Sequence, residues 1–479
     1  MRACRHVGIE QGEDGILADG IQQDLTEGSV AMKLAQFALP FLASSVVQSL
    51  YSFADMLIVG RFSGPISMSG VNIGGQVTLF LTNIVIGMCV GVTVLIGQHA
   101  GAGKQELLRK AASTALAILP LAAIALTVLM LVFKRPLLVL IQTPPESFAE
   151  SDRYLSVTVS GLVFIFGYNA FSAILRGMGD SKHPFFFVLA ACATNVALDL
   201  LFVVVFHWDA FGAALATVIS QALSVSLCIG FLAKNKRQLG LQLAPLEIDS
   251  EQLTRILVLG LPTSVANSIV NISFVYITAI VNIVGGVYAS AAVGAANKFN
   301  SFAFMPALAI SAAISAMAAQ NIGAGQLGRA VQATRLGTAV SFLLMGSFFV
   351  FVQLYPAQVI SIFGNDPNMA RHGVAYMRSF SFDFLVLPFV FCLNALFTAG
   401  GHTLFTLASS IFTSILLRVP ICWLFGAILG WGMFGVGMAA PTASVGALVA
   451  SLCFLASGRW KHNVALGAGA ATDASAFIG

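Results

Sequence analysis

Residues 68–103 read MSGVNIGGQVTLFLTNIVIGMCVGVTVLIGQHAGAG. This stretch contains no Asp, Glu, Lys or Arg, and it is long enough to cross a bilayer as a helix. Similar stretches recur along the chain, separated by short polar breaks. Membrane β-strands would instead alternate in polarity over about ten residues. The pattern therefore predicts an all-α membrane protein.

The overall composition agrees with a lipid environment. Charged residues make up 9% of the 479 residues and hydrophobic residues 58%, whereas a soluble domain is about 25% charged. A chain this apolar cannot cover a water-facing surface with polar groups. The net charge of +4 comes from positive residues near the ends of the apolar runs. They read as topology signals, so no nucleic-acid partner is expected.

Twelve spans are predicted. They cover about residues 33–57, 68–98, 111–133, 154–176, 184–206 and 210–233, and then about residues 254–284, 290–319, 333–354, 375–398, 404–428 and 431–457. The predicted organisation is an N-terminal tail (1–30), a six-helix bundle (31–233), a polar linker (234–251), a second six-helix bundle (252–457) and a C-terminal tail (458–479).

Lys and Arg in the loops predict the orientation. With a cytoplasmic N-terminus, the inside segments hold 15 of these residues and the outside loops hold 6. Positive residues concentrate on the cytoplasmic side of membrane proteins. We therefore expect a multi-pass protein of the plasma (inner) membrane with both termini, the linker and both tails in the cytoplasm.

The two halves of the chain repeat. QHAGAG at 98–103 returns as QNIGAG at 320–325, an offset of 222. The GAG segments that end them, 101–103 and 323–325, are read as tight cytoplasmic turns. Tyr154 and Tyr376 keep the same offset. Six spans per half leave the halves in the same orientation, related by a pseudo-two-fold axis along the membrane normal. Two such bundles facing each other predict a carrier with a central cleft and alternating access, for which a monomer suffices.

Ionisable side chains at membrane depth are costly and are functional candidates. In the first half these are Asp55 and Asp199. Tyr51 lies four residues before Asp55, and Asn195 four before Asp199, so each carboxylate shares a helix face with a hydrogen-bonding neighbour. Two such faces meeting would form an oxygen-lined pocket for a proton, a small hard cation or the positive end of a drug. The alternative is that Asp55 is an exposed residue near the outer interface and that Asp199 makes a structural hydrogen bond.

The second half offers a weaker polar site, consisting of Asp383, Lys298 and Arg418. A structural ion pair among these three residues is at least as plausible as a role in transport. No further acid occurs between Glu251 and Asp366 or between Asp383 and Asp473. A coupling site built from carboxylates is therefore expected mainly in the first half.

Several motifs in order resemble the MATE (multidrug and toxic compound extrusion) transporters. They are DLTEGS at 24–29, FALP at 37–40, QSLY at 48–51 followed by Asp55 and VGR at 59–61, the repeated QxxGAG, LRGMGD at 175–180, NVALD at 195–199 and RVP at 418–420. The resemblance covers about residues 24–457.

This resemblance implies a V-shaped pair of bundles that exports organic cations or amphipathic drugs by proton- or sodium-coupled antiport. In one branch of the family the coupling site matches Asp55, Asn195, Asp199 and Thr217 here, with Tyr51 beside it. The same positions are the implied site for sodium. Another branch uses a Glu in span 7 and an Asp in span 10. This chain has no acid in span 7, and Asp383 lies about one turn from the expected position.

Other functions fit the sequence less well. A lipid-linked oligosaccharide flippase of the same superfamily would need a strongly basic cavity, and only Lys298 and Arg418 are basic at depth. A sugar or metabolite carrier of another two-half fold would have a different loop after span 2. An enzyme would need a nucleophile–base pair or a metal cluster, and no Cys or His spacing provides one. Neither an enzyme activity, a structural metal nor a cofactor is expected.

Overall fold

The computed structural model describes residues 24–239, 247–364 and 366–462, and this part of the chain is helical with short connections. Most of both predicted tails, and the centre of the predicted linker, lie outside the described residues. The helices of the first half are α1 (Val30–Phe62), α2 (Gly64–Gly101), α3 (Gln105–Leu140), α4 (Pro145–Ser160), α5 (Leu162–Gly177), α6 (Lys182–Asp199) with the π-helix η3 (Leu200–Val205), and α7 (Asp209–Leu239).

The second half contains α8 (Ser250–Gly323), which is broken at Gly286, where φ is 63° and ψ is −154°. A positive φ of this kind suits glycine, which lacks a Cβ. The remaining elements are α9 (Leu327–Leu354), α10 (Pro356–Ser361), α11 (Pro367–Phe380), α12 (Asp383–Ala399), α13 (Thr403–Ile411), η4 (Phe412–Arg418), α14 (Val419–Trp423), η5 (Leu424–Ile428), α15 (Gly432–Ala456) and the 3₁₀ turn η6 (Arg459–Lys461).

Many of these helices are long and apolar enough to cross a membrane. Nine helical stretches in the described residues meet that criterion, or up to eleven when each of two bent pairs is one span. The bent pairs are α4 with α5 (45°) and α11 with α12 (46°). The helices extend beyond several predicted span ends. α3, for example, begins at Gln105 and ends at Leu140, because hydrogen bonding within the helix continues past the apolar stretch.

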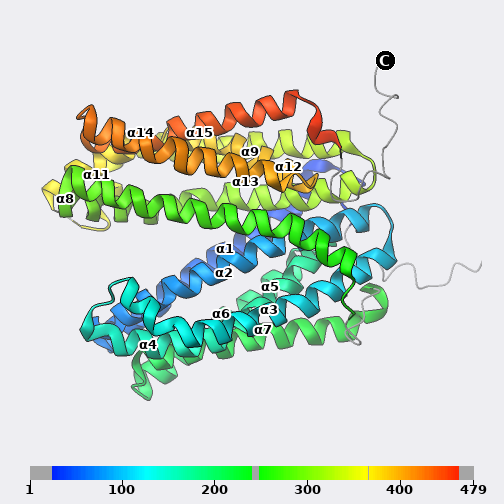
Figure 1. Cartoon of the computed structure of the whole chain (residues 1–479), viewed down its shortest axis with the longest axis horizontal. Coiled ribbons are helices and arrows are strands. Elements are labelled where there is room, and N and C mark those ends of the chain that lie inside the picture. The colour runs from blue at the N-terminus through cyan, green and yellow to red at the C-terminus, as the bar shows by residue number, and fades with distance from the viewer. Residues whose placement is uncertain (1–23, 240–246, 365, 463–479) are drawn as a thin grey trace, which may run out of the picture.

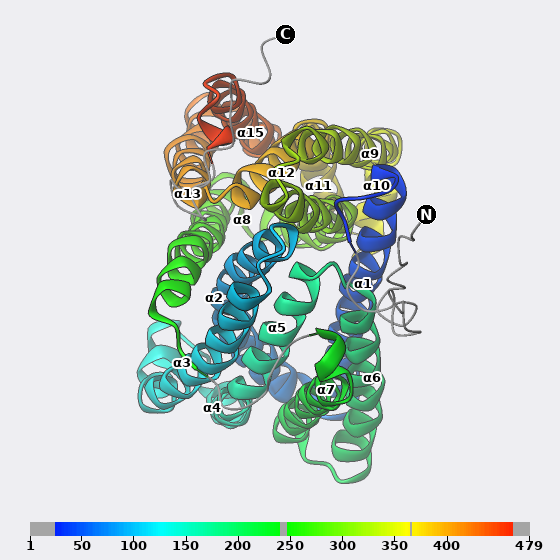
Figure 2. The same ribbon diagram turned by 90° about the vertical axis from the view of Figure 1, so that its right-hand side faces the viewer.

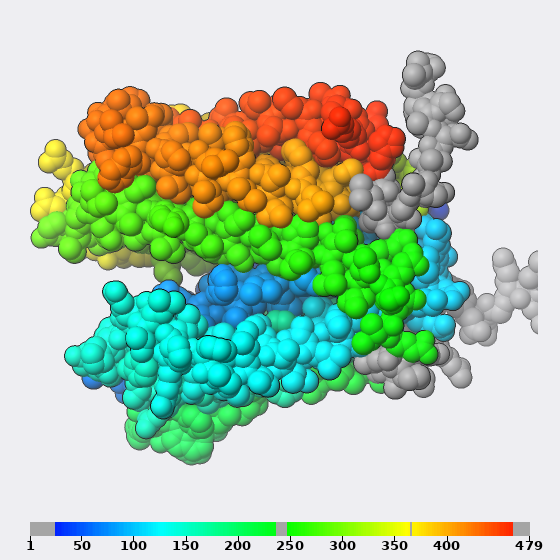
Figure 3. Space-filling view, viewed as in Figure 1, coloured from blue at the N-terminus to red at the C-terminus, as the bar shows by residue number. Residues whose placement is uncertain are grey.

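The halves of the chain occupy different parts of the molecule. Figure 1 shows the helices of residues 30–239 below and those that follow α8 above, with the end of α15 at the right. Figure 3 shows a hollow between the two groups that opens at the left and is closed at the right. Figure 2, viewed from that closed end, shows the helices of both groups meeting there.

Two reciprocal contacts join α2 and α8 at the closed end. A Cβ at Gly101 would lie 1.8 Å from the carbonyl oxygen of Gln320, and a Cβ at Gly323 would lie 2.1 Å from that of Gln98. These glycines therefore let the two helix ends touch through their backbones. The predicted tight turns follow these glycines and contain Gly103 and Gly325, where φ is 66° and 74°.

The two glutamines of the repeated motif also hydrogen-bond across the halves. The Gln98 amide nitrogen donates to the carbonyl oxygen of Ala399 at 2.6 Å, and that of Gln320 donates to the carbonyl oxygen of Gly177 at 2.9 Å. Gly177 and Ala399 are themselves 222 residues apart. The closed end is thus held by two pairs of contacts that follow the internal repeat.

Candidate functional site

Two carboxyl groups meet inside the first half. Asp55 lies on α1 and Asp199 ends α6, and their side chains are 7% and 0% exposed. The two side chains are close enough to share a hydrogen bond. Such a bond requires a proton on one of them, because a carboxylate can only accept. With that bond formed, the pair would hold one proton and one negative charge.

Asn195 and Thr217 complete the surroundings of Asp199. With the Asn195 amide oriented to satisfy both neighbours, its nitrogen donates to Asp199 Oδ2 at 3.0 Å and its oxygen accepts from the Thr217 N–H at 3.2 Å. The Thr217 hydroxyl donates to the carbonyl oxygen of Ala213, one turn earlier on α7, at 3.0 Å. Helices α1, α6 and α7 therefore each contribute to one buried cluster.

Two tyrosines border this cluster. Tyr51, one turn before Asp55 on α1, lies close to the side chain of Thr217. Tyr154, on α4, is 6% exposed and lies close enough to interact electrostatically with Asp55 and Asp199. Sequence reasoning used Tyr154 only as a marker of the repeat and missed its position beside the carboxyl pair. The signal available in the sequence was that this tyrosine recurs in the second half as Tyr376.

The carboxyl pair retains unused hydrogen-bonding capacity. Oδ1 of Asp55 and Oδ1 of Asp199 are both buried and have no hydrogen-bond partner. Buried oxygens without partners are expensive and often mark a functional site. The backbone after Asp199 also changes, because α6 passes directly into the π-helix η3. Short π-helical segments are frequent at functional sites. The cluster offers the oxygen donors that a proton or a hard cation requires.

In the second half the predicted polar residues are only partly brought together. Asp383 and Arg418 are 2% and 9% exposed and interact electrostatically, but the described residues include no ion pair between them within 4.0 Å. Lys298 is exposed on α8. Asp383 begins α12 directly after the 46° bend, where a carboxylate is favoured by the helix dipole. The corresponding position in the first half is Gly161.

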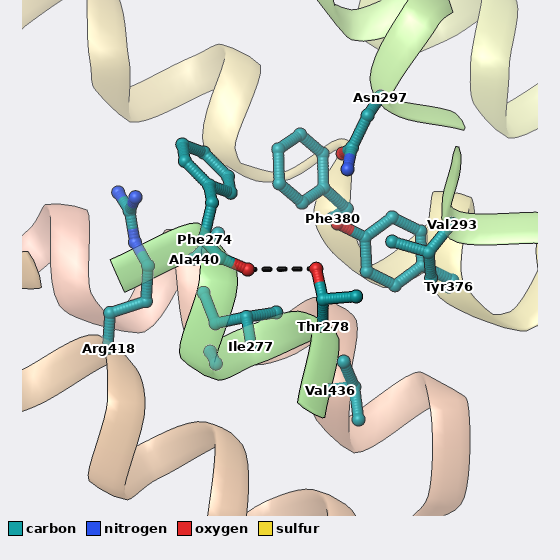
Figure 4. A pocket seen from close by; sticks show the side chains of 11 residues that line it. Phe274, Ile277, Thr278, Val293, Asn297, Tyr376, Phe380, Arg418, Val436 and Ala440 are labelled. Carbon is teal, nitrogen blue, oxygen red and sulfur yellow. Dashed lines mark hydrogen bonds between the residues drawn. The ribbon is translucent and has the colours of Figure 1, made fainter. Parts of the chain in front are cut away.

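Figure 4 shows a small cavity in the second half, lined by Tyr376, Thr278 and Arg418 among others. Its volume is about 10 Å³, and small-molecule sites usually span about 300–1,000 Å³. The guanidinium of Arg418 lies beside the ring of Phe274, 5.7 Å from its centroid. This cavity can hold no more than a water-sized group and is therefore too small for a drug.

The MatE family model matches residues 40–201 and 262–424. This chain belongs to the MATE family of transporters. The two matched stretches begin 222 residues apart, which is the offset of the internal repeat. Each half of this MATE protein therefore carries its own copy of the family pattern.

Individual relatives agree with this placement. The probable multidrug resistance protein YoeA of Bacillus subtilis is 28% identical over 430 residues, covering 88% of this chain and 93% of that protein. The FAD transporter of Shewanella oneidensis is 26% identical over 374 residues, covering 76% and 79%.

The same fold occurs in a solved structure, the outward-facing conformation of a multidrug resistance MATE family transporter of the MOP superfamily. It aligns with a TM-score of 0.84 at 21% identity over 91% of this chain and 98% of that one. The protein is thus a multi-pass membrane transporter with multidrug-resistance relatives, and its family is not one of enzymes.

Proposed function

We propose that this MATE protein is a secondary active multidrug exporter, which expels organic cations and amphipathic drugs in exchange for protons or sodium ions. The buried Asp55–Asp199 pair is the observation that carries the proposal. An acid pair away from water is costly, and a transporter that must bind and release a cation has a use for it. The named multidrug-resistance relatives support the choice of substrate class.

The proposed architecture is twelve spans in two six-helix bundles, residues 31–233 and 252–457. The eleven spans counted with the bent pairs become twelve when α8 is divided at Gly286. Dividing it there gives α8 two membrane-length parts. Six spans then fall in each half, as the repeat requires.

The proposed orientation places the closed end in the cytoplasm. That end carries the starts of α1 and α8 and the ends of α7 and α15. Both tails and the linker of residues 234–251 would then be cytoplasmic, and the hollow would open to the outside. We propose a monomer in the plasma (inner) membrane, because one chain already supplies both sides of the hollow.

Charge balance explains how the carboxyl pair could couple the two fluxes. Losing the shared proton would leave Asp55 and Asp199 with two negative charges in contact, an arrangement that low-dielectric surroundings disfavour. The charges must then separate, which moves α1 relative to α6, or be neutralised by another cation. A sodium ion bound by Asp55, Asn195, Asp199 and Thr217, or a cationic drug nearby, would neutralise them. Binding of the drug and of the coupling ion is therefore mutually exclusive.

A transport cycle follows from this exclusion. With the hollow open to the outside, a proton or sodium ion binds the pair and the drug leaves. The neutralised site favours reclosure at the outer end and opening of the α2–α8 contact. In the cytoplasm the ion leaves, and a new drug binds to the recharged site. At each side of the membrane, the coupling ion and the drug therefore replace each other at the site.

Ethidium export by protein reconstituted in liposomes tests the proposal. A proton gradient or a sodium gradient is imposed, and wild type is compared with Asp199→Asn and with Asp383→Asn as the matched control in the second half. We expect export driven by one of the two ions, its loss in Asp199→Asn and its survival in Asp383→Asn. Gradient-driven export that persists in Asp199→Asn would refute the first-half coupling site. Absence of export under either gradient would instead favour another cargo, such as the lipid-linked oligosaccharide of the flippase alternative.

A further inference from the structure

A polar groove lies at the closed end, between the start of α1 and the first turns of α9, which adjoin each other in Figure 2. Its volume is about 660 Å³. It is lined by residues 28–31 and by Arg329, Gln332, Arg335 and Leu336, and is called the α1–α9 groove below. A cavity of this size accommodates a small molecule or a head group.

The residues that line the α1–α9 groove include two arginines and no acid. The guanidinium of Arg329 donates to the carbonyl oxygens of Gly28 (3.0 Å) and Leu25 (3.4 Å) and to Asn321 Oδ1 (3.1 Å), all of which are neutral acceptors. Arg335 is exposed. Neither arginine forms an ion pair within the part of the chain that the structure describes. Two fixed positive charges therefore line the groove, with no carboxylate among its lining residues.

The start of α1 adds hydrogen-bond donors. Ser29 is the N-cap residue of α1, but its side chain makes no capping hydrogen bond. The first backbone N–H groups of a helix have no partner within the helix, and they carry the positive end of its dipole. The groove therefore combines free N–H groups with two guanidinium groups, a donor set that suits a phosphate.

Apolar surface continues from the groove along both helices. Ala31 lines the groove, and Leu39, eight residues later on the same face of α1, is 63% exposed. Leu343 lies eight residues after Arg335 on α9 and is 71% exposed. Eight residues of helix rise about 12 Å. A molecule with a phosphate in the groove would thus have room for hydrocarbon chains along Leu39 and Leu343.

We infer that the α1–α9 groove binds the phosphate of an anionic phospholipid, whose acyl chains lie along α1 and α9. Basic pockets between membrane helices on the cytoplasmic side are suited to such head groups. The choice of leaflet rests on the proposed orientation, whereas the binding itself does not depend on drug transport or on the carboxyl pair. Because α1 and α9 belong to different halves, a lipid bound here holds the halves together and favours the state with this end closed.

Mass spectrometry of the intact, full-length protein in detergent tests the site. Phosphatidylglycerol or phosphatidylcholine is titrated into wild type, Arg335→Gln, Arg335→Lys and Arg61→Gln. The last variant loses the same charge at the other end of α1, where Arg61 is also exposed. We expect wild type to prefer phosphatidylglycerol and Arg335→Gln to bind it about fivefold more weakly. Arg335→Lys and Arg61→Gln should bind it as wild type does.

Three results would overturn this inference. One is unchanged phosphatidylglycerol binding in Arg335→Gln, and another is an equal loss in Arg61→Gln, which would reflect net charge alone. The third is displacement of the lipid by inorganic phosphate at concentrations comparable to that of the lipid, which would make the ligand a soluble phosphate. Because no step measures transport, failure here is distinct from failure of the exporter proposal.

Discussion

Replacing Gly101 by alanine is expected to open the closed end of the molecule. The new Cβ would lie 1.8 Å from the carbonyl oxygen of Gln320, and Cβ contacts under 3.0 Å essentially do not occur. The obstacle is backbone in a buried helix, so no flexible side chain can move aside to make room. The two helix ends must therefore separate by about 1.2 Å, the difference between these distances.

This separation is enough to break the hydrogen bonds between the halves. The bond from Gln320 to Gly177 would lengthen from 2.9 Å to about 4.1 Å, and that from Gln98 to Ala399 from 2.6 Å to about 3.8 Å. Both exceed the range of a hydrogen bond. Each such bond contributes about 1 kcal/mol. Losing both would raise the population of the opened end by roughly 30-fold.

Hydrogen–deuterium exchange measures this opening on the unlabelled protein. Amide exchange in residues 98–104 and 320–326 is compared among wild type, Gly101→Ala and Gly328→Ala. Gly328 lies at the same end, and a Cβ there would meet nothing within 4 Å. We expect faster exchange in both segments for Gly101→Ala only, by up to roughly 30-fold. Exchange in Gly101→Ala that matches wild type, with folding intact, would refute the reasoning.

Three further changes have defined outcomes. Asp383→Asn removes the charge that interacts with the buried guanidinium of Arg418, so the melting temperature in detergent should fall; an equal or higher value would contradict this. Gly74→Ala places a Cβ 2.6 Å from the Tyr154 ring and should destabilise the protein by about 1–3 kcal/mol in the same assay. Asp249→Ala removes the N-cap of α8 and should cost about 1 kcal/mol at neutral pH. Hydrogen bonds from the Gln252 and Glu251 backbone lower the Asp249 pKa, so the difference should vanish as pH falls below 3.8 through that lowered pKa.

Apolar length was enough to predict helical spans, and the ordered motifs were enough to predict the family from sequence. Periodicity also placed Tyr51 with Asp55 and Asn195 with Asp199, because residues four apart share a helix face. Which helices then meet was not encoded in these local patterns. The contact between α1 and α6 that brings Asp55 to Asp199 follows from packing of the whole half.

Contacts that depend on the register between helices were not predictable. Gly101 and Gly323 were interpreted as turn residues, whereas they lie at helix ends pressed against the opposite half. Nothing in one helix specifies which partner residue lies opposite. Lys298 illustrates the same limit. Its place in an apolar stretch marked it as a candidate, but the sequence did not specify the face of α8 on which it is exposed.

Ion-dependent drug binding tests the central claim most directly. The affinity of purified protein for ethidium is measured at low and high proton and sodium concentrations, in wild type and in Asp199→Asn. Mutual exclusion at the Asp55–Asp199 pair predicts that one of the ions weakens ethidium binding to wild type, and that this dependence disappears in the variant. An ion dependence that is the same in both proteins would contradict coupling through the carboxyl pair.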